Sequence, residues 1–330
     1  MQPLIACSIT GTGSSLPERV VSNDELAQSL HVDSDWILKR TGIRERRWCS
    51  PEIATSDLAI SASKAALADA GVSAAEVDLV IVATSTPDWP QPPTAARVHG
   101  TLGMRPDAAA FDVDGVCSGW IHAMHLGSAM LAAHAHWQHV LVVGADTYSR
   151  ITNPSDRSTR ILFGDGAGAA LLSHNPQTDT GILATHAFTN FAGHEALQVA
   201  AGGSREPITA EALIAQRNYF SMDGRAVREF GVREMCNAFT SLSTAVDGAH
   251  PDLLILHQSN LRMLEAACET LGFDQTHMAT TIEHAGNTAA ASIPLTLDAA
   301  RRQGRIYPGA LIAMIGYGGG LSAAGLLYRA

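Results

Sequence analysis

The chain has 330 residues, a length that corresponds to about two domains or two structural halves. Hydrophobic residues make up 46% and charged residues 16%, so we expect a large buried core and exclude a dominantly disordered chain. The formal net charge of -10 is opposite in sign to that of a typical nucleic-acid-binding domain, which excludes that class. Five cysteines at low density argue against a disulfide framework and favour a reducing, cytoplasmic compartment.

Apolar segments of strand length alternate along the chain with longer, Ala-rich segments. In chain order we predict strands at 79–83 and 108–113, a helix at 118–136, strands at 140–143 and 253–256, a helix at 289–302 and a strand at 309–314. No apolar run approaches the roughly 18 residues of a membrane span, and the N-terminal segment lacks the basic region of a secretory signal. We therefore expect a cytoplasmic protein that does not enter a membrane.

Two parts of the chain resemble each other. The strands that follow Asp78 and Asp252 lie 174 positions apart, and a second strand and a helix start each recur after 170 positions. Similar offsets indicate an internal duplication, although short apolar runs can also match by chance.

The duplication predicts the fold class. Strands alternating with helices predict an α/β protein whose parallel sheets are buried on both faces. We expect two halves, residues 1–175 and 176–330, packed as a five-layered α/β/α/β/α sandwich. Residues 185–218 have weak periodicity and mixed polarity, so we predict an insertion there that serves as a lid or a wall of a substrate channel.

Cys117 is the candidate nucleophile. It follows the predicted strand 108–113 and a turn at Gly115, and it precedes the predicted helix, which places its thiol at a helix N-terminus. There the helix dipole and free N–H groups are expected to lower the pKa of the thiol and to stabilise developing negative charge. The alternative is a small buried side chain, which is our interpretation of the other four cysteines.

His257 and Asn287 are candidate partners of Cys117. His257 ends the predicted strand 253–256, and strand carboxyl ends are where α/β proteins place ligands, although an isolated histidine can equally be a satisfied polar residue. Asn287 occupies, in the second half, the strand-to-helix position that Cys117 occupies in the first. The duplication therefore predicts a common site for the three side chains.

Glycine runs, histidines and arginines allow more than one interpretation. Residues 318–320 could supply backbone N–H groups close to a substrate or form a tight turn, and residues 164–168 lack the spacing and the lysine of a phosphate-binding loop. The histidines between 122 and 139 lack a ligand pattern, so we predict no metal site. The basic residues at 39–47 and around 225–233 form either a solvated surface or a mouth for a phosphate-bearing ligand or acidic carrier.

Seven ordered motifs, spread over essentially the whole chain, give it a resemblance to one family. They are SLPERVVSNDEL at 15–26, WILKRTGIRER at 36–46, FDVDGVCSGW at 111–120, ILFGDGAGA at 161–169, HQSN at 257–260, GNTAAASIP at 286–294 and GYGGGLS at 316–322. With these motifs the chain resembles β-ketoacyl-[acyl-carrier-protein] synthase III, of the thiolase-like condensing enzymes.

The resemblance implies a thiolase-like fold in a homodimer and a role for each site residue. It implies Cys117 as nucleophile, His257 and Asn287 as its partners, and an oxyanion hole formed by the backbone N–H groups of Cys117 and Gly319. The other implied positions are Trp36, Arg40, Arg157, Gly224, Arg225 and Asn260 for CoA binding, Arg228 and Arg262 for carrier docking, and Trp89 and Tyr317 for the acyl pocket.

The implied reaction is a decarboxylative Claisen condensation. An acyl group passes from acyl-CoA to Cys117, and a malonyl thioester, implied to be malonyl-acyl carrier protein, then loses CO2 and attacks the acyl-cysteine. CoA thioesters are substrates, and we expect no permanently bound cofactor.

Several positions depart from the family pattern. Gly115, Val116 and Ser118 stand where alanines are more usual, Trp89 replaces a phenylalanine, and Glu229 takes the place of a basic residue. These departures leave open which primer is used and how a carrier docks.

Other functions therefore stay open. One alternative is a related acyltransferase or specialised-metabolite condensing enzyme with a different primer or acceptor, and another is a Cys–His thioester hydrolase. A hydrolase would need neither Asn287 nor malonate, and a binding role gives no reason for three reactive side chains at strand ends.

Overall fold

The structure is a computed structural model that describes residues 3–175 and 179–330. In the first half the strands are β1 (Ile5–Ser15), β4 (Leu79–Ala83), β5 (Ala109–Val113), β6 (His139–Thr147) and β7 (Asp165–His174), in the spatial order β1-β7-β6-β4-β5. In the second half they are β8 (Gly181–Thr189), β11 (Leu253–Leu256), β12 (Leu311–Gly318) and β13 (Ser322–Arg329), in the order β8-β13-β12-β11. A short pairing of β1 with β8 joins the two sets into one nine-stranded sheet.

The two halves repeat the same strand order and directions. β1 and β8 each pair antiparallel with the last strand of their half, β7 and β13. β4 and β11 each pair parallel with the next strand inward, β6 and β12. Where β5 completes the first half, an isolated parallel bridge from Leu254 to Met278 takes its place in the second. This repetition is what a duplication predicts; the expected boundary at 175/176 adjoins residues 176–178, which lie outside the described residues.

The expectation of parallel sheets was wrong for part of each half. Only β4, β5 and β6, and likewise β11 and β12, run parallel, whereas β7 and β13 run antiparallel to their neighbours. β13 follows β12 after a tight turn at 319–321, and such a connection joins antiparallel strands only.

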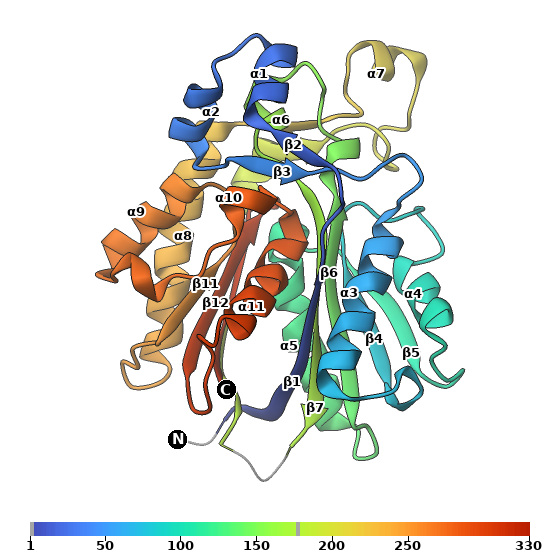
Figure 1. Cartoon of the computed structure of the whole chain (residues 1–330), viewed down its shortest axis with the longest axis vertical. Helices are drawn as coiled ribbons and strands as arrows, with labels where there is room; N and C mark the ends of the chain where they lie inside the picture. The colour runs from blue at the N-terminus through green and yellow to red at the C-terminus, as the bar shows by residue number, and fades with distance from the viewer. Residues whose placement is uncertain (1–2, 176–178) are drawn as a thin grey trace.

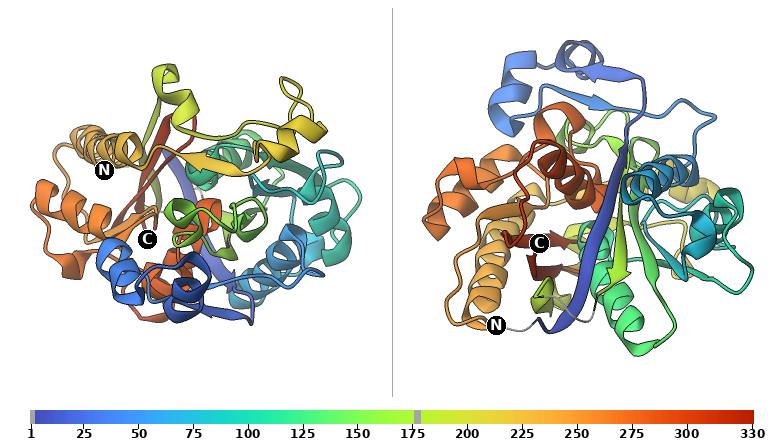
Figure 2. Two further views of the ribbon diagram at one scale, coloured as in Figure 1. Left: turned by 90° about the horizontal axis from the view of Figure 1, so that it is seen from above. Right: turned by 60° about the horizontal axis from the view of Figure 1, so that its bottom comes forward.

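Helices and sheet strands form the five layers that the duplication predicts (Figure 1). The outer helices are α3 (Thr55–Ala70) and α4 (Thr94–Leu102) on one side and α8 (Gly224–Thr244) and α9 (Leu261–Leu271) on the other. The view from above in Figure 2 also places these two pairs on opposite sides. Between the strands of the two halves lie α5 (Gly119–Ala133) and α11 (Ser292–Arg302), which the predicted helices at 118–136 and 289–302 contain.

The middle layer carries one of the hydrophobic clusters that make up the core. Trp120 and Met124 of α5 and Ile293 of α11 are buried together with side chains of β4, β6, β12 and β13. A helix that packs against strands on both sides is apolar around its circumference, which explains the apolar and Ala-rich character of α5.

The glycine-rich segment at 164–168 allows a strand and a helix to pack closely against each other. Gly168 lies on β7 against α11, where an added Cβ atom would come within 2.5 Å of the backbone nitrogen of Leu295. Only a glycine permits this close approach of strand and helix.

The predicted insertion begins later than residue 185. Residues 185–189 belong to β8 and pair with β13, so they form part of the main sheet. The segment that follows contains β9 (Leu197–Val199) and α7 (Ala210–Ile214), and β9 pairs antiparallel with β10 (Phe220–Met222). The remaining short elements are β2 (Val20–Ser22), α1 (Asn23–Leu30), α2 (Ser34–Thr41), β3 (Glu45–Arg47), α6 (Arg157–Arg160) and α10 (Ile282–Ala285).

Among the described residues, no helix combines the length and the apolar character that crossing a membrane requires. All five cysteines are free.

Candidate active site

Cys117 lies where β5 leads into α5. It is the middle residue of a 3-10 turn (Val116–Ser118) and is 8% exposed. Val116 has a φ of 49°, a left-handed conformation that costs free energy for a β-branched residue. A hydrogen bond of 3.1 Å from the Val116 N–H to Oδ1 of Asp114 supports this conformation. No side chain caps the start of α5, so the first N–H groups of this helix have no side-chain acceptor.

The resting form of Cys117 is the thiol. Burial raises the pKa of Cys117, and the nearby carboxylates of Asp146 and Asp114 raise it further. The expectation that the helix terminus lowers this pKa was therefore wrong, because desolvation of a buried thiolate outweighs the favourable dipole. Any nucleophilic attack by this thiol would have to be accompanied by loss of its proton.

His257 follows β11 directly and is 2% exposed. Its backbone N–H donates to the carbonyl oxygen of Ile315 at 2.8 Å, which continues the pairing with β12. Burial lowers the pKa of the His257 imidazole to about 3, so the ring is neutral at physiological pH. Its Nδ1 atom lies 2.7 Å from Oγ of Ser292.

Asn287 is held in place by its backbone and its amide oxygen. Its N–H donates to the carbonyl oxygen of Leu162, and its carbonyl oxygen accepts from the N–H of Gly164, both at 2.9 Å. Its Oδ1 atom accepts the N–H of Ala289 at 2.9 Å. Because a backbone N–H can only donate, this contact fixes the amide orientation and leaves the NH2 group for the pocket.

We predicted that Asn287 is the counterpart of Cys117 in the second half, but the true counterpart lies three residues further along the chain. The 3-10 turn that precedes α11 spans Ala289–Ala291, so Ala290 is the counterpart of Cys117. Asn287 lies in the segment before that turn, where it bridges to Phe163. The two halves nevertheless bring Asn287 and Cys117 to the same pocket, as expected.

One pocket of about 400 Å³ contains most of the predicted site residues. This volume is within the range of small-molecule sites. The predicted residues that line it are Cys117, His257, Asn287, Arg40, Gly224, Arg228, Asn260, Arg262 and Tyr317. Leu197, Gln198 and Val199 of β9 also line it, so part of the predicted insertion forms a wall of the pocket.

A groove adjoins the pocket at its mouth. Trp36 lines this groove together with Arg40, Arg228 and Arg262, which also line the pocket. The guanidinium carbon of Arg40 lies 5.5 Å from the centre of the Trp36 ring. The structure thus places an aromatic plane and several cations at one entrance.

Four predicted site residues line neither the pocket nor the groove. Arg157 is exposed at the first position of α6, and Arg225 is exposed on α8, where it pairs with Glu229 at 3.0 Å. Trp89 is 50% exposed on the loop after β4. Gly319 follows β12, directly after Gly318, which lines the pocket.

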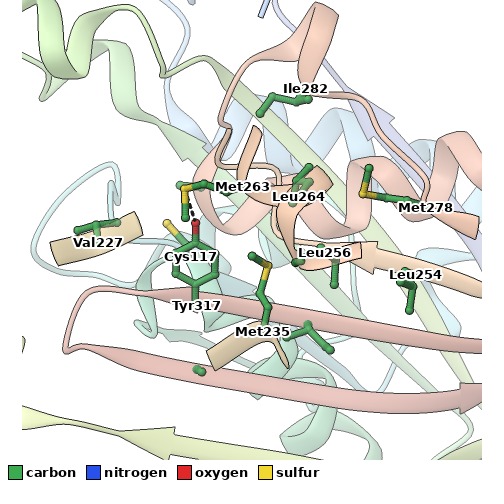
Figure 3. Packing of buried hydrophobic residues seen from close by; sticks show 14 of the residues in the cluster. Cys117, Val227, Met235, Leu254, Leu256, Met263, Leu264, Met278, Ile282 and Tyr317 are labelled. Carbon is green, nitrogen blue, oxygen red and sulfur yellow. Dashed lines mark hydrogen bonds between the residues drawn. The ribbon is translucent and has the colours of Figure 1, made fainter. Parts of the chain in front are cut away.

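Tyr317 contacts the neighbourhood of Cys117 (Figure 3). Its hydroxyl lies 2.5 Å from Oγ of Ser259 and donates to the sulfur of Met263 at 3.5 Å. Its ring makes an edge contact with the His257 ring at a centroid distance of 5.4 Å. These contacts immobilise a large side chain beside the His257 imidazole.

Gly318 lies so close to Cys117 that a larger residue would crowd it. An added Cβ atom would lie 3.0 Å from the Cys117 backbone nitrogen and 3.1 Å from the Cys117 Cβ. We expect Gly318→Ala to destabilise the protein by about 1–3 kcal/mol and to slow acylation of Cys117, because the turn around the thiol must shift. Thermal unfolding and mass spectrometry of the acylated protein measure the two effects.

Gly100→Ala on α4 is the matched control, because nothing lies within 4 Å of the added Cβ atom. It should leave acylation unchanged and should not lower the melting temperature. Equal behaviour of the two variants would contradict the close packing at Gly318.

An aromatic wall of the pocket was not predicted. Tyr148, Phe163 and Phe220 line the pocket, with ring centroids 4.6 to 5.5 Å apart. The Tyr148 hydroxyl lies 3.1 Å from Oγ of Ser85, which also lines the pocket. The sequence signal that could have identified Tyr148 is its position directly after a buried strand, where α/β proteins place ligands.

These features define a class of enzyme: a thiolase-like fold with a buried cysteine at a helix start, beside a neutral histidine and an oriented asparagine amide. Models of 3-oxoacyl-[acyl-carrier-protein] synthase III and of its C-terminal part match residues 111–190 and 243–330. The chain belongs to the 3-oxoacyl-[acyl-carrier-protein] synthase III family and is a condensing enzyme of the acyltransferase type.

Individual relatives cover almost the whole chain. It is 46% identical to an acetoacetyl CoA synthase, NphT7, of Streptomyces sp. strain CL190, over 96% of both chains. It is 41% identical to a β-ketoacyl-[acyl-carrier-protein] synthase III of Rhodospirillum rubrum, over 97% of this chain and 98% of that one. A crystal structure of such a synthase from Pseudomonas aeruginosa PAO1 matches with a TM-score of 0.89 and 36% identity, over 98% of both chains.

Proposed function

We propose that this enzyme joins a short acyl group from acyl-CoA to a malonyl thioester by way of an acyl-Cys117 intermediate, with loss of CO2. The observation that carries the proposal is the joint placement of the Cys117 thiol, the His257 imidazole and the Asn287 amide in one pocket. A neutral imidazole and an amide are hydrogen-bond donors without charge, which suits an oxygen that becomes negative only during the reaction.

In the first half-reaction Cys117 attacks the thioester carbonyl of the primer. The backbone N–H groups of Cys117 and Gly319 stabilise the tetrahedral oxyanion, at a helix start that lacks a side-chain cap. The carbon–sulfur bond to CoA breaks, and the CoA thiolate takes up the proton that the Cys117 thiol releases. The products are acyl-Cys117 and CoA.

In the second half-reaction His257 and Asn287 each donate a hydrogen bond to the thioester oxygen of the malonyl group. This oxygen gains negative charge as the bond to the carboxylate breaks and CO2 leaves. The resulting enolate carbon attacks the acyl-Cys117 carbonyl, the carbon–sulfur bond to Cys117 breaks, and the Cys117 thiolate takes up a proton from water. The product is a β-ketoacyl thioester.

The mouth of the pocket suits the nucleotide part of CoA. Trp36 offers an aromatic face to the adenine, and Arg40 and Arg228 offer charge to the phosphates. We propose that Arg157, Gly224, Arg225 and Asn260 complete this binding site, as the family pattern implies. The enzyme needs no permanently bound cofactor for this chemistry, and we assign it to the cytoplasm, where thiols stay reduced.

Two extender substrates fit the proposed reaction. We propose malonyl-acyl carrier protein, with Arg228 and Arg262 as the docking residues. A malonyl-CoA extender is favoured by a specific observation: Arg262, one of the two docking residues, pairs with Glu265 at 2.8 Å, so part of the basic docking surface is neutralised. The name of the acetoacetyl CoA synthase relative points in the same direction.

Product analysis with each extender tests the proposed reaction. The enzyme is incubated with acetyl-CoA and either malonyl-CoA or malonyl-acyl carrier protein, and CO2 and the thioester products are measured. A β-ketoacyl thioester with CO2 supports the proposal, and the preferred extender identifies the carrier. Free acid without any requirement for malonate would identify a hydrolase instead.

We further propose a homodimer that involves β5 and Trp89. β5 is the last strand of the sheet, its five residues are half-buried, and its outer edge has no partner strand among the described residues. An open edge of this kind pairs readily with a second copy. Trp89, exposed on the neighbouring loop, would then reach the acyl pocket of the partner subunit.

The aromatic wall is expected to restrict the primer to short acyl groups. We expect Tyr148→Ala to raise acylation by hexanoyl-CoA relative to acetyl-CoA about tenfold, because room for about two more buried CH2 groups, at about 0.8 kcal/mol each, corresponds to a preference of this size. Mass spectrometry of Cys117 acylation in a mixture of the two acyl-CoAs measures the preference. Tyr307→Ala, at a tyrosine that is 51% exposed and does not line the pocket, is the control. An unchanged preference in Tyr148→Ala would place the acyl chain elsewhere.

A further inference from the structure

Ser292 is a buried hydroxyl beside His257 that the sequence analysis did not assign. It is the first residue of α11 and is fully buried. Its Oγ atom lies 2.7 Å from Nδ1 of His257 and accepts the backbone N–H of Gln258 at 3.3 Å. Ser292 therefore contacts the imidazole at Nδ1 and does not contact the second ring nitrogen, Nε2.

The hydrogen atoms in this cluster can be assigned by elimination. The Gln258 N–H can only donate, so it occupies one lone pair of the serine oxygen. The hydroxyl hydrogen of Ser292 then needs an acceptor, and Nδ1 is the acceptor that the described residues offer. The opposite arrangement, with a hydrogen on Nδ1, would leave the buried hydroxyl hydrogen of Ser292 unsatisfied, which costs free energy.

We propose that Ser292 sets the tautomer of His257 by donating its hydroxyl hydrogen to Nδ1, which keeps the ring proton on Nε2. This inference rests on the proposed function, in which His257 donates a hydrogen bond to the malonyl thioester oxygen. Nε2 makes no hydrogen bond with the described residues and is not among the buried polar atoms without a partner, so it reaches the pocket surface. Ser292 is thus a positioning residue that acts through His257.

The two half-reactions depend differently on the tautomer of His257. An Nε2–H group can donate to the malonyl thioester oxygen, but it cannot accept the proton of the Cys117 thiol. Acylation of Cys117 should therefore be insensitive to Ser292, whereas decarboxylation and condensation should depend on it. A purely structural serine would affect both steps through a general loss of order.

The first test is Ser292→Ala with the half-reactions measured one at a time. Acylation is followed by intact-protein mass spectrometry with acetyl-CoA alone, and discharge is followed after addition of malonyl-CoA or malonyl-acyl carrier protein, whichever discharges the wild type. We expect acylation within twofold of the wild type and discharge slower by about 10–100-fold, the usual effect of removing an outer partner of a functional histidine. Ser292→Thr, which keeps the hydroxyl, should recover part of the discharge rate.

Ser63→Ala is the matched control. Ser63 is also a fully buried serine on a helix, its hydroxyl donates to the carbonyl oxygen of Ala59 at 2.7 Å, and it does not line the pocket. It should change neither half-reaction. Equal slowing of both half-reactions in Ser292→Ala would assign Ser292 a structural role and overturn the proposal.

Nitrogen-15 NMR of the wild-type protein tests the tautomer without any substitution at Ser292. Histidines are labelled on both ring nitrogens, and a His257→Gln sample identifies the His257 signals. We expect a proton on Nε2 and an unprotonated Nδ1; a proton on Nδ1 would overturn the proposal even if Ser292→Ala fails to fold.

Failure of the proposed function would look different. If the wild type is not acylated, or if no malonyl thioester discharges it, the proposed function fails regardless of Ser292. If both wild-type steps proceed and Ser292→Ala discharges at the wild-type rate, only the Ser292 proposal fails.

Discussion

Cys117→Ala is expected to abolish acyl transfer, with a loss of about 10⁴-fold or more, because Cys117 supplies the one thiol among the described residues that line the pocket. The variant should still release CO2 from a malonyl thioester at a slow rate, because His257 and Asn287 remain. Intact-protein mass spectrometry with acetyl-CoA measures the first effect, and CO2 release measures the second.

Cys236→Ala is the control for this substitution. Cys236 lies half-buried on α8 and does not line the pocket, so its loss should leave acylation unchanged. A mass gain in Cys117→Ala that equals the wild-type gain would show that the acyl group is carried elsewhere, and the proposed mechanism would fail at its first step.

Asn287→Asp is expected to slow condensation by about 10²–10³-fold while acylation of Cys117 continues. The substitution replaces a hydrogen-bond donor by a carboxylate in a site that is 5% exposed, and this charge repels both the malonyl carboxylate and the developing enolate. The new side chain can still accept the N–H of Ala289, so the local backbone should keep its conformation. Stepwise mass spectrometry, first with acetyl-CoA and then with a malonyl thioester, measures both reactions.

Asn190→Asp serves as the matched control for Asn287→Asp. The Asn190 side chain accepts the N–H of Ala192, a bond that aspartate can also accept, and Asn190 does not line the pocket. It should not affect either step. Condensation at the wild-type rate in Asn287→Asp would refute the role proposed for Asn287.

The sequence was sufficient to predict the layers and the residues that meet in the pocket. Cys117 and His257 could be found because each follows an apolar strand, and Asn287 because it belongs to a motif that is local in the chain. The strand directions of β7 and β13 could not be found in this way, since an apolar run carries no information about the direction of its neighbour.

Features that depend on tertiary contacts were also missed. Ser292 approaches His257 only after α11 has packed against β11, and Tyr148 joins Phe163 and Phe220 from separate segments. The pKa of Cys117 was predicted in the wrong direction because the sequence indicates the helix start but not the depth of burial. The local motif thus predicts the identity of the nucleophile, and only the packing determines its protonation state.

A single-turnover experiment tests the central claim most directly. Purified enzyme is acylated with acetyl-CoA, freed from excess CoA, and mixed with a malonyl thioester, and the protein mass and the small products are followed over time. The proposed mechanism predicts an acetyl group on Cys117 that disappears as CO2 and a β-ketoacyl thioester form in equal amounts. An acetyl-enzyme that persists, or that releases only free acetate, would contradict it.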